Sequence, residues 1–471
     1  MAGGELRLDP DRLLPADGAT RAVARRLYEQ VAGLPIVSPH GHVPAALLAD
    51  DQAFADPVSL LVSPDHYVTR LLHASGVGLD TLGVGRASLG EDEARAAWRV
   101  LCSHWAVFAA TPVRYWLTEQ LVGIFGVTAR PGPDSADELF DQISARLAEP
   151  AFRPRALLAR FGIDVLATTD DPVDDLAAHT RLAAAGGVAT RVLPTFRPDA
   201  YLEAAAPGWR RRVERLATVT GRDTATYAGW VAAMEDRRAY FRAHGAVATD
   251  HGHIDAGTQP LERAEAAATY RRAWDGEASG QECTALRRHM VWEMARMAAD
   301  DGLVMTMHPG VLRGHHRPTS ARFGPDTGHD IPVAVEFTRA LRPLLSDFGT
   351  AAGFRLVLFS VDESVFSREL APLAGFYPCV YLGAPWWFLD APAAVARFRQ
   401  AVTETAGFSR TAGFVDDTRA LCSLPVRHDM ARRLDAGYLA GLVVSGVLAE
   451  DEAGETALDL VAERPRAVFG L

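Results

Sequence analysis

The sequence contains no lysine and no asparagine, so all 48 of its basic residues are arginines. The absence of lysine removes metal centres that are bridged by a carboxylated lysine, and it leaves arginine as the main cationic contact for an acidic ligand. The remaining composition is ordinary for a folded protein, because 48% of the 471 residues are hydrophobic and 23% are charged. A mostly disordered or collagen-like chain is therefore excluded.

Long apolar segments are also absent. The longest apolar run, residues 436–449, contains three glycines and is shorter than the roughly 20 residues that a membrane-spanning helix needs. The first 14 residues carry five charged side chains and no apolar core, so they do not resemble a secretory signal. We therefore expect a cytoplasmic protein that makes no contact with a membrane.

The four cysteines, Cys102, Cys283, Cys379 and Cys422, lack the spacing of a metal or redox motif. In a reducing compartment they are expected to be free and mostly buried. The net charge of −11 disfavours nucleic acid as a partner, and the dense basic cluster at 210–215 contains an acidic residue, as is typical of the solvent face of a helix. Small-molecule chemistry is the favoured class of function.

Short apolar runs that end in polar residues recur along the chain. Eight of them are found, at residues 34–38, 165–169, 190–195, 246–249, 303–307, 354–360, 379–382 and 411–415. Most of the segments between them are long enough for a helix and have helical spacing of apolar residues, as at 332–342 and 391–406. Eightfold alternation of strand and helix predicts an α/β fold, a (β/α)8 TIM barrel.

Two connections are longer than a simple crossover. Residues 44–159 form a predicted helical insertion after strand 1, expected to cover the barrel mouth, in which residues 135–138 open a helix in the manner of a capping box. Residues 252–300 form a second helical excursion, with amphipathic candidates at 261–274 and 283–299. Because no Gly/Ser/Pro linker divides the chain, we expect residues 1–471 to form a single barrel domain.

The first and last predicted strands end in residues that suit a metal ion. Active sites of such barrels lie at the carboxyl ends of the strands. His40 and His42 are two residues apart in extended chain, so their imidazoles face the same side, and Asp416 and Asp417 end the neighbouring last strand. Two imidazoles and one carboxylate predict a divalent-cation site. The alternative is two loop histidines and an acidic turn paired with Arg419.

Other strand ends supply further candidates for proton transfer. His308 follows the fifth strand and is a candidate third imidazole ligand or acid/base, although a lone histidine at such a position is more often structural. Asp250 and His251 end the fourth strand, either as a proton-handling pair or as a capped turn.

Three arginines, Arg197, Arg313 and Arg419, follow three different strands. Convergent guanidinium groups suit bidentate binding of a carboxylate or phosphate, whereas each arginine taken singly could form an ordinary surface ion pair. The sequence has no glycine-rich phosphate loop, so a carboxylate-bearing substrate is favoured.

Ten ordered blocks of the chain resemble the uronate isomerase family of the amidohydrolase superfamily. These blocks are residues 39–42, 65–67, 168–179, 193–199, 250–252, 308–313, 324–330, 386–390, 417–419 and 427–428. The resemblance implies an amidohydrolase-type barrel that interconverts D-glucuronate with D-fructuronate, and D-galacturonate with D-tagaturonate. It also implies proton transfer through an enediol and one divalent metal ion, usually zinc.

The resemblance further implies roles for individual residues. The metal ligands would be His40, His42 and Asp417, with His308 as a further ligand or acid/base. The substrate contacts would be Arg197, Arg313, Arg419 and Trp386. The catalytic candidates are Tyr67, Asp417, His308, Asp250 and His251, and Tyr67 and Asp417 come first as the group that takes the C2 proton.

The chain departs from the family pattern at Ser38, His73, Arg114 and Asp416, while the metal ligands and the three arginines are retained. Two other functions are compatible with such a barrel: a mononuclear hydrolase of a small carboxylated lactone, amide or ester, and a sugar-acid binding protein without turnover. The missing lysine excludes those binuclear hydrolases of the superfamily whose metals are bridged by a carboxylated lysine. A binding protein would be expected to have lost a metal ligand, and none is lost. The expected partner is a small hexuronate, and the acidic surface is compatible with a monomer or a homo-oligomer.

Overall fold

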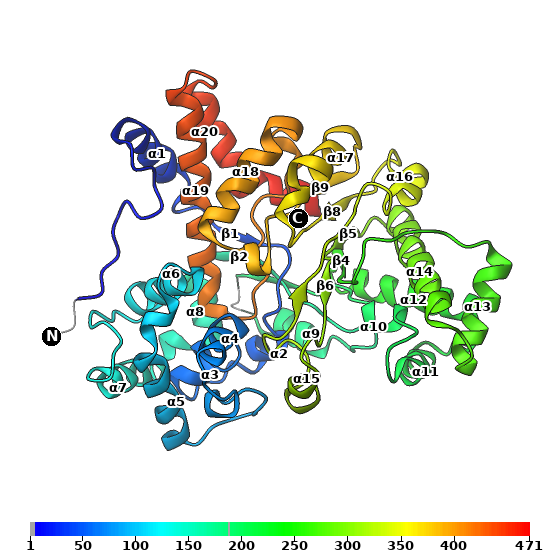
Figure 1. Cartoon of the computed structure of the whole chain (residues 1–471), viewed down its shortest axis with the longest axis horizontal. Coiled ribbons are helices and arrows are strands. Elements are labelled where there is room, and N and C mark those ends of the chain that lie inside the picture. The colour runs from blue at the N-terminus through cyan, green and yellow to red at the C-terminus, as the bar shows by residue number, and fades with distance from the viewer. Residues whose placement is uncertain (1–4, 187–188) are drawn as a thin grey trace.

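The computed structural model describes residues 5–186 and 189–471, and parallel strands form its centre. These strands are β1 (Ile36–Ser38), β2 (Ile163–Ala167), β3 (Arg191–Leu193), β4 (Ala248–His251), β5 (Val304–Met307), β8 (Leu356–Leu358) and β9 (Val380–Leu382). They pair in the orders β1-β2-β3 and β4-β5-β8-β9. A parallel bridge between Phe196 and Thr249 joins the two sheets, and another joins Leu382 to Thr411. The molecule is the predicted (β/α)8 barrel (Figure 1).

Seven of the eight predicted strands are confirmed, and the eighth is not a regular strand. In residues 411–415 the backbone pairs with β9 through Ala412, whose N–H donates to Leu382 O at 2.8 Å. Gly413 then adopts a φ of +75°, and a Cβ there would lie 2.9 Å from Leu460 O. Because this conformation breaks β geometry, the ladder stops after one bridge. The segment still occupies the eighth position of the barrel, where His42 N donates to Thr418 O at 2.9 Å.

The helix predicted over 332–342 is wrong. The chain forms an antiparallel hairpin of β6 (Val311–Leu312) and β7 (Ile331–Pro332), and the next helix, α16, begins only at Arg342. Two main-chain donors that a helix would use internally are taken elsewhere, since Phe337 N and Thr338 N both donate to the buried carboxylate of Glu369, and Val333 N pairs outside the segment with Gly310 O. Tertiary hydrogen bonds therefore override the helical spacing of apolar residues.

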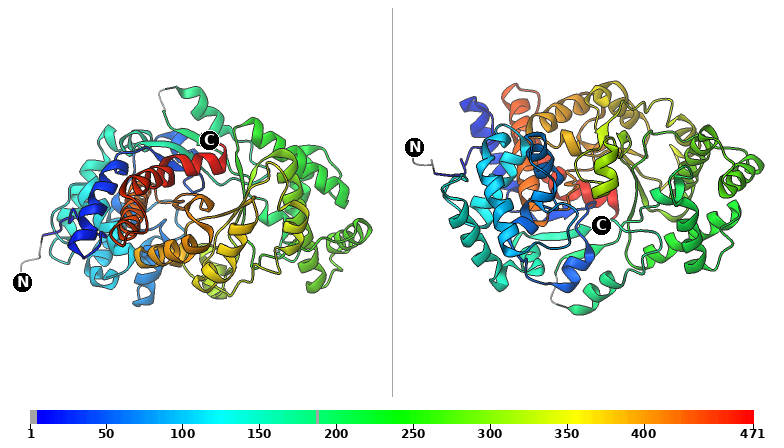
Figure 2. Two further views of the ribbon diagram at one scale, coloured as in Figure 1. Left: turned by 90° about the horizontal axis from the view of Figure 1, so that it is seen from above. Right: turned by 60° about the horizontal axis from the view of Figure 1, so that its bottom comes forward.

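The segments that connect the barrel strands contain helices, and these helices surround the barrel. Outside the insertion they are α1 (Gly18–Val31), α9 (Ala177–Ala185), α10 (Asp199–Leu202), α11 (Trp209–Thr220), α12 (Tyr227–Ala243), α13 (Arg263–Asp275), α14 (Gly280–Asp301), α15 (Arg317–Phe323), α16 (Arg342–Phe348), α17 (Ala371–Phe376), α18 (Pro392–Ala406), α19 (Leu424–Val444), α20 (Glu450–Leu458) and α21 (Arg464–Phe469). Helices α13, α14 and α18 confirm three predicted helices. Helix α1 packs against α19 and α20, so early and late segments of the chain lie side by side (Figure 2).

The predicted helical insertion is confirmed. It contains α2 (Ala45–Asp50), α3 (Pro57–Leu61), α4 (His66–Ala74), α5 (Glu91–Ser103), α6 (Pro112–Glu119), α7 (Ala136–Leu147) and α8 (Pro154–Arg160). These helices lie on one side of the barrel and α11–α14 lie on the other (Figures 1 and 2). Helix α7 begins where expected, but its capping box does not form, because Ser135 Oγ accepts from Gly132 N at 3.1 Å, in the preceding loop, instead of from a helix N–H.

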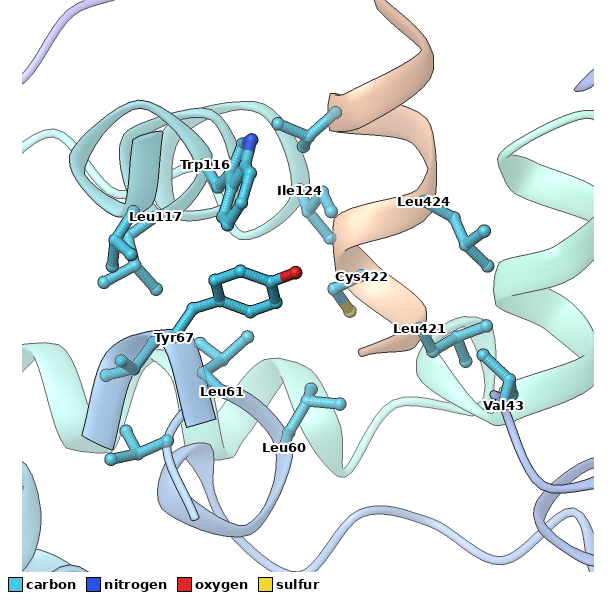
Figure 3. Packing of buried hydrophobic residues seen from close by; sticks show 14 of the residues in the cluster. Val43, Leu60, Leu61, Tyr67, Trp116, Leu117, Ile124, Leu421, Cys422 and Leu424 are labelled. Atoms are coloured by element: carbon cyan, nitrogen blue, oxygen red, sulfur yellow. The ribbon is translucent and has the colours of Figure 1, made fainter. Parts of the chain in front are cut away.

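An apolar cluster anchors the insertion to the segment after the last barrel strand (Figure 3). Tyr67 of α4 packs edge-on against Trp116 of α6, with ring centroids 5.3 Å apart. Cys422 lies on the side of its segment toward the Tyr67 ring, and Leu421 and Leu424 extend the same cluster on the side toward Val43 (Figure 3). Each large apolar side chain buried in this way contributes about 1.5–3 kcal/mol. The cluster therefore holds α4 against the barrel, and with it the residues that α4 brings to the mouth.

The structure confirms the predictions for the cysteines and for the basic cluster. All four cysteines are free and buried. The basic cluster lies on α11, where Arg210, Arg211 and Arg215 are exposed. In the described part of the chain, no helix is both long enough and apolar enough to span a bilayer.

Candidate active site

Three predicted metal ligands converge at the carboxyl ends of the first and last barrel segments. His40 Nε2 and His42 Nε2 lie 3.3 Å and 3.0 Å from the same atom, Asp417 Oδ1. Neither approach has hydrogen-bond geometry, since this buried oxygen has no hydrogen-bond partner among the described residues. Two imidazole nitrogens and a carboxylate oxygen aimed at one point are a donor set that fits a divalent metal ion.

The local backbone explains this convergence. Thr169 Oγ1 donates to Gly41 O at 2.8 Å and His42 N donates to Thr418 O, so the His-x-His loop is held between the second and eighth barrel positions. Asp417 has a φ of +42°, a left-handed conformation that is unfavourable for a residue with a Cβ. Strain of this kind is stored where the surroundings fix the chain, and it is frequent at functional sites.

The electrostatics of the three ligands favour their metal-binding forms. Burial alone would raise the pKa of Asp417, but the imidazoles of His40 and His42 hold it well below its usual range. Burial lowers the pKa of His42. Burial also opposes protonation of His40, but the carboxylates of Asp250 and Asp417 raise its pKa. An ionised Asp417 beside a neutral His42 matches what a cation requires of its ligands.

His308 and Asp250 form a buried pair beside these ligands. His308 Nδ1 lies 2.7 Å from Asp250 Oδ1, and the His308 ring stacks on His40 with centroids 4.7 Å apart. His308 Nε2 is buried and has no hydrogen-bond partner in the described part of the chain. Burial would raise the pKa of Asp250, but Arg197 and the two histidines hold it well below the usual value. His308 is therefore oriented by Asp250, with its second nitrogen free.

The three predicted arginines line one pocket together with the metal-fitting residues. The pocket is lined by His42, Asp65, His66, Tyr67, Arg197, Arg313, Asp326, Trp386, Trp387, Asp417, Thr418 and Arg419. Arg313 Nη1 lies 2.7 Å from Asp326 Oδ1, and Arg419 Nη2 lies 3.4 Å from Asp326 Oδ2. Two guanidinium groups thus converge on one carboxylate. Arg197 Nη1 lies 3.1 Å from Asp250 Oδ2, deeper in the mouth.

The insertion contributes Tyr67 to this pocket. Asp65 caps α4 by accepting from Tyr67 N at 2.9 Å, which fixes where the tyrosine leaves the helix. Tyr67 is 7% exposed, and burial raises its pKa, so the phenol is protonated at neutral pH. Trp386, the predicted substrate contact, also lines the pocket and lies edge-on to His308 with centroids 4.9 Å apart.

Sequence reasoning placed His251 with the catalytic residues, but the structure places it elsewhere. Its neighbour Asp250 points toward His308, and His251 lies in a separate cluster with Asp199 and His253. Successive side chains of a strand point to opposite faces, so adjacent residues of β4 cannot both face the pocket. Burial lowers the pKa of His251 to about 3.

The residue-by-residue assignment missed His66, Asp326 and Trp387, which line the pocket. All three lie inside sequence blocks that resemble the uronate isomerase family, so the resemblance could have identified them as site residues. Asp326 and Trp387 have left-handed φ values of +57° and +52°. The identity of these residues does not predict this backbone conformation. The two arginines Arg313 and Arg419, which follow different strands, indicate a nearby carboxylate as their partner, and this argument could have identified Asp326.

The departures from the family pattern fall into two groups. Ser38 and Asp416 are buried next to the ligands, and Asp416 Oδ2 lies 3.0 Å from His428 Nε2. Arg114 lies over the Trp105 ring at 4.3 Å, and His73 contacts Val77 O, so neither lines the pocket.

A (β/α)8 barrel with His-x-His after the first strand and an aspartate after the last defines an enzyme of the amidohydrolase type, with a metal-binding mouth. The sequence model of one family, described as glucuronate isomerase, matches residues 18–469. The chain belongs to the glucuronate isomerase family.

Similar proteins agree over the full length. A uronate isomerase of Cutibacterium acnes is 55% identical over 471 residues and covers 100% of both chains. The crystal structure of glucuronate isomerase from Caulobacter crescentus superimposes with a TM-score of 0.96 at 42% identity, covering 99% of this chain and 97% of that one. The uronate isomerase of Thermotoga maritima gives 0.92 at 28% identity, covering 98% and 99%.

Proposed function

We propose that the protein is a metal-dependent aldose–ketose isomerase of hexuronates, which interconverts D-glucuronate with D-fructuronate and D-galacturonate with D-tagaturonate. The observation that carries the proposal is one pocket that is lined by His42 and Asp417 of the metal-fitting cluster and by three arginines, with the third member of the cluster, His40, buried behind them. Relatives named uronate isomerase over the whole chain support the same reaction.

Zinc is the proposed ion. His40, His42 and Asp417 would hold it, and His308 Nε2 is available as a further ligand or as an acid/base. Two imidazoles and a carboxylate suit zinc and leave positions open for substrate oxygens. A bound divalent ion would polarise the substrate carbonyl and stabilise the charge that develops on it.

Arginines are proposed to hold the sugar acid. Arg313 and Arg419 both contact the carboxylate of Asp326. This arrangement supports the proposal that the same two guanidinium groups also bind the carboxylate of the substrate. Arg197 is held by Asp250 and would contact an oxygen nearer the reacting carbons. The flat face of Trp386 would cover the apolar side of the chain of carbons.

Removal of the C2 proton is assigned to Asp417, and stabilisation of the developing oxyanion is assigned to Tyr67. Asp417 is ionised, so it can take the C2 proton of the open-chain aldose while the C2–H electron pair forms the C1=C2 bond of an enediol. The carbonyl oxygen at C1 gains a proton in that step. Return of a proton to C1, with loss of the proton on the C2 oxygen, gives the ketose. Tyr67 stays protonated and would donate a hydrogen bond to the developing oxyanion.

The test uses the zinc-loaded enzyme with D-glucuronate and with D-galacturonate. Ketose formation is followed in D2O, where deuterium at C1 of the product is expected for an enediol route. Loss of turnover after chelation and its return with zinc are also expected. Ketose without solvent deuterium would favour hydride transfer, and hydrolysis of a lactone or amide with no ketose from either sugar would contradict the isomerase proposal.

Three further expectations belong to this proposal. We propose that the whole chain folds as a single domain, because one apolar cluster contains residues of the insertion, the barrel strands and α21. A cytoplasmic location is supported by four buried free thiols. The oligomeric state, monomer or homo-oligomer, is measured by light scattering on the purified protein.

A further inference from the structure

We propose that the protein has a second divalent-cation site, formed by Asp199, His251 and His253 and separate from the pocket ligands. One ligand atom from each residue lies within 4.8 Å of the other two. The three residues come from the ends of two neighbouring barrel positions, with Asp199 after β3 and the histidines at the end of β4. This cluster shares no residue with the one that contains Asp417.

The atoms that face this point are buried and unsatisfied. Asp199 Oδ1, His251 Nδ1 and His253 Nε2 all lack a hydrogen-bond partner within residues 5–186 and 189–471. His251 and His253 are 1% and 3% exposed. Buried polar atoms are nearly always paired, and Asp199 Oδ1 lies 3.6 Å from His253 Nε2, so these unpaired atoms support an occupant of the cluster.

The opposite side of each histidine has a partner. His253 Nδ1 lies 2.7 Å from Glu203 Oε1, and a ring N–H that donates to a carboxylate leaves the other nitrogen with its lone pair. His251 Nε2 lies 3.2 Å from Thr249 Oγ1, and a hydroxyl can donate to a ring nitrogen or accept from it. A bound cation would select the tautomer in which Nε2–H donates to the hydroxyl and Nδ1 keeps its lone pair. A carboxylate behind a ligating histidine is the usual outer support of a metal site.

Asp199 is oriented in the same way. Its Oδ2 accepts from Gly252 N at 3.0 Å and from Arg197 Nε at 3.1 Å, and its Oδ1 therefore points toward His253 Nε2 at 3.6 Å. With His251 in that tautomer, three acceptors face the site, and a cation can bind all of them, whereas a water molecule donates only two hydrogen bonds. Two imidazoles with one carboxylate suit an ion of the zinc type.

The site is linked to the substrate pocket through Asp199. That carboxylate contacts Arg197, which lines the pocket and also pairs with Asp250. An ion on Oδ1 would fix the carboxylate from behind and so fix the guanidinium in front of it. Its role in the proposal is structural, as a support for a substrate-binding arginine.

The test counts bound zinc in the full-length protein. Metal-stripped wild type and variants are brought to equilibrium by dialysis against the same excess of Zn2+, and zinc per chain is measured by mass spectrometry. Two ions per wild-type chain are expected, and one each for His253→Gln and for His42→Gln. The matched control is His289→Gln, a buried histidine that pairs with Tyr227 Oη at 2.7 Å outside both clusters, which should keep two.

One ion per wild-type chain at saturation, or two in His253→Gln, would overturn the proposal. A second measurement does not depend on variant folding. Crystals of the wild type grown with Zn2+ should show an anomalous peak about 2.0–2.2 Å from Asp199 Oδ1, His251 Nδ1 and His253 Nε2. A water or empty density there, with a peak at Asp417, would also overturn it. Neither readout depends on the isomerase reaction.

Discussion

Asp250 contacts His308 with one carboxylate oxygen, at 2.7 Å from Nδ1, and Arg197 with the other, at 3.1 Å from Nη1. One buried carboxylate therefore orients an imidazole beside the metal-fitting cluster and a guanidinium that lines the substrate pocket. Because both contacts use the negative charge, Asp250 couples the position of the two groups.

Asp250→Asn is expected to disturb both groups without changing the size of the side chain. An amide accepts at one atom and donates at the other, so either His308 or Arg197 loses its partner. We expect kcat/KM to fall by about 10- to 100-fold or more. Steady-state kinetics check this, with Asp301→Asn as the control, since Asp301 pairs with Arg238 away from the pocket. Equal losses in the two variants would contradict the coupling.

Asp417→Asn is expected to abolish tight metal binding. The variant keeps the shape of the side chain but removes the charge that His40 and His42 share. Zinc retained after dialysis should fall by one ion per chain, and turnover should fall by at least about 100-fold. A variant that keeps its zinc content and its rate would exclude Asp417 as a ligand and as the base.

Arg313→Lys tests the proposed carboxylate anchor. Lysine keeps the charge but cannot make two parallel hydrogen bonds. The loss of about 1.5–3 kcal/mol corresponds to a rise in KM of about 10- to 100-fold, with a smaller change in kcat. Arg322→Lys is the control, because Arg322 is 66% exposed and pairs with Asp80 on the surface. An unchanged KM in Arg313→Lys would remove this arginine from substrate binding.

Tyr67→Phe removes the hydroxyl but keeps the ring that packs on Trp116. We expect kcat to fall by about 100-fold, as for loss of one oxyanion donor, and the melting temperature to stay close to that of the wild type. Since burial raises the pKa of Tyr67, the wild-type rate should show no loss from phenol ionisation up to about pH 10. A wild-type rate in the variant would show that the hydroxyl takes no part.

Asp170→Asn tests a pH effect on stability. Burial raises the pKa of Asp170 to about 6, so the folded state holds a proton that the unfolded state loses near pH 4. Stability is therefore lost as the pH rises through this window. Relative to the variant, the wild type should lose about 2 kcal/mol of unfolding free energy between pH 4.5 and 7 in urea titrations. Parallel pH profiles for the two proteins would contradict this shift.

The sequence predicted best where residue type and strand position coincide. Eight apolar runs followed by polar residues were enough for the barrel. Position at neighbouring strand ends predicted a cluster of His40, His42 and one of the two carboxylates Asp416 and Asp417, and the family resemblance selected Asp417. Both inferences use the rule that parallel strands end together, which needs no side-chain detail.

The wrong helix has a different physical cause. The helix predicted over 332–342 is displaced by hydrogen bonds to Gly310 and to Glu369, which are distant in sequence. A pattern of apolar residues within one segment carries no information on such distant partners. The placement of His251 away from the pocket, while its neighbour Asp250 points toward His308, likewise depends on which face of β4 each side chain occupies.

The seam between β1 and residues 411–418 forms no regular ladder in the described part of the chain, although His42 N donates across it to Thr418 O. Ligands from both sides of this seam, near opposite ends of the chain, would share one ion. Such a cross-link closes a very long loop, and its entropic benefit grows with the logarithm of loop length. We therefore expect bound metal to lengthen the survival of the protein under proteolysis, because without it few main-chain hydrogen bonds would hold this junction closed.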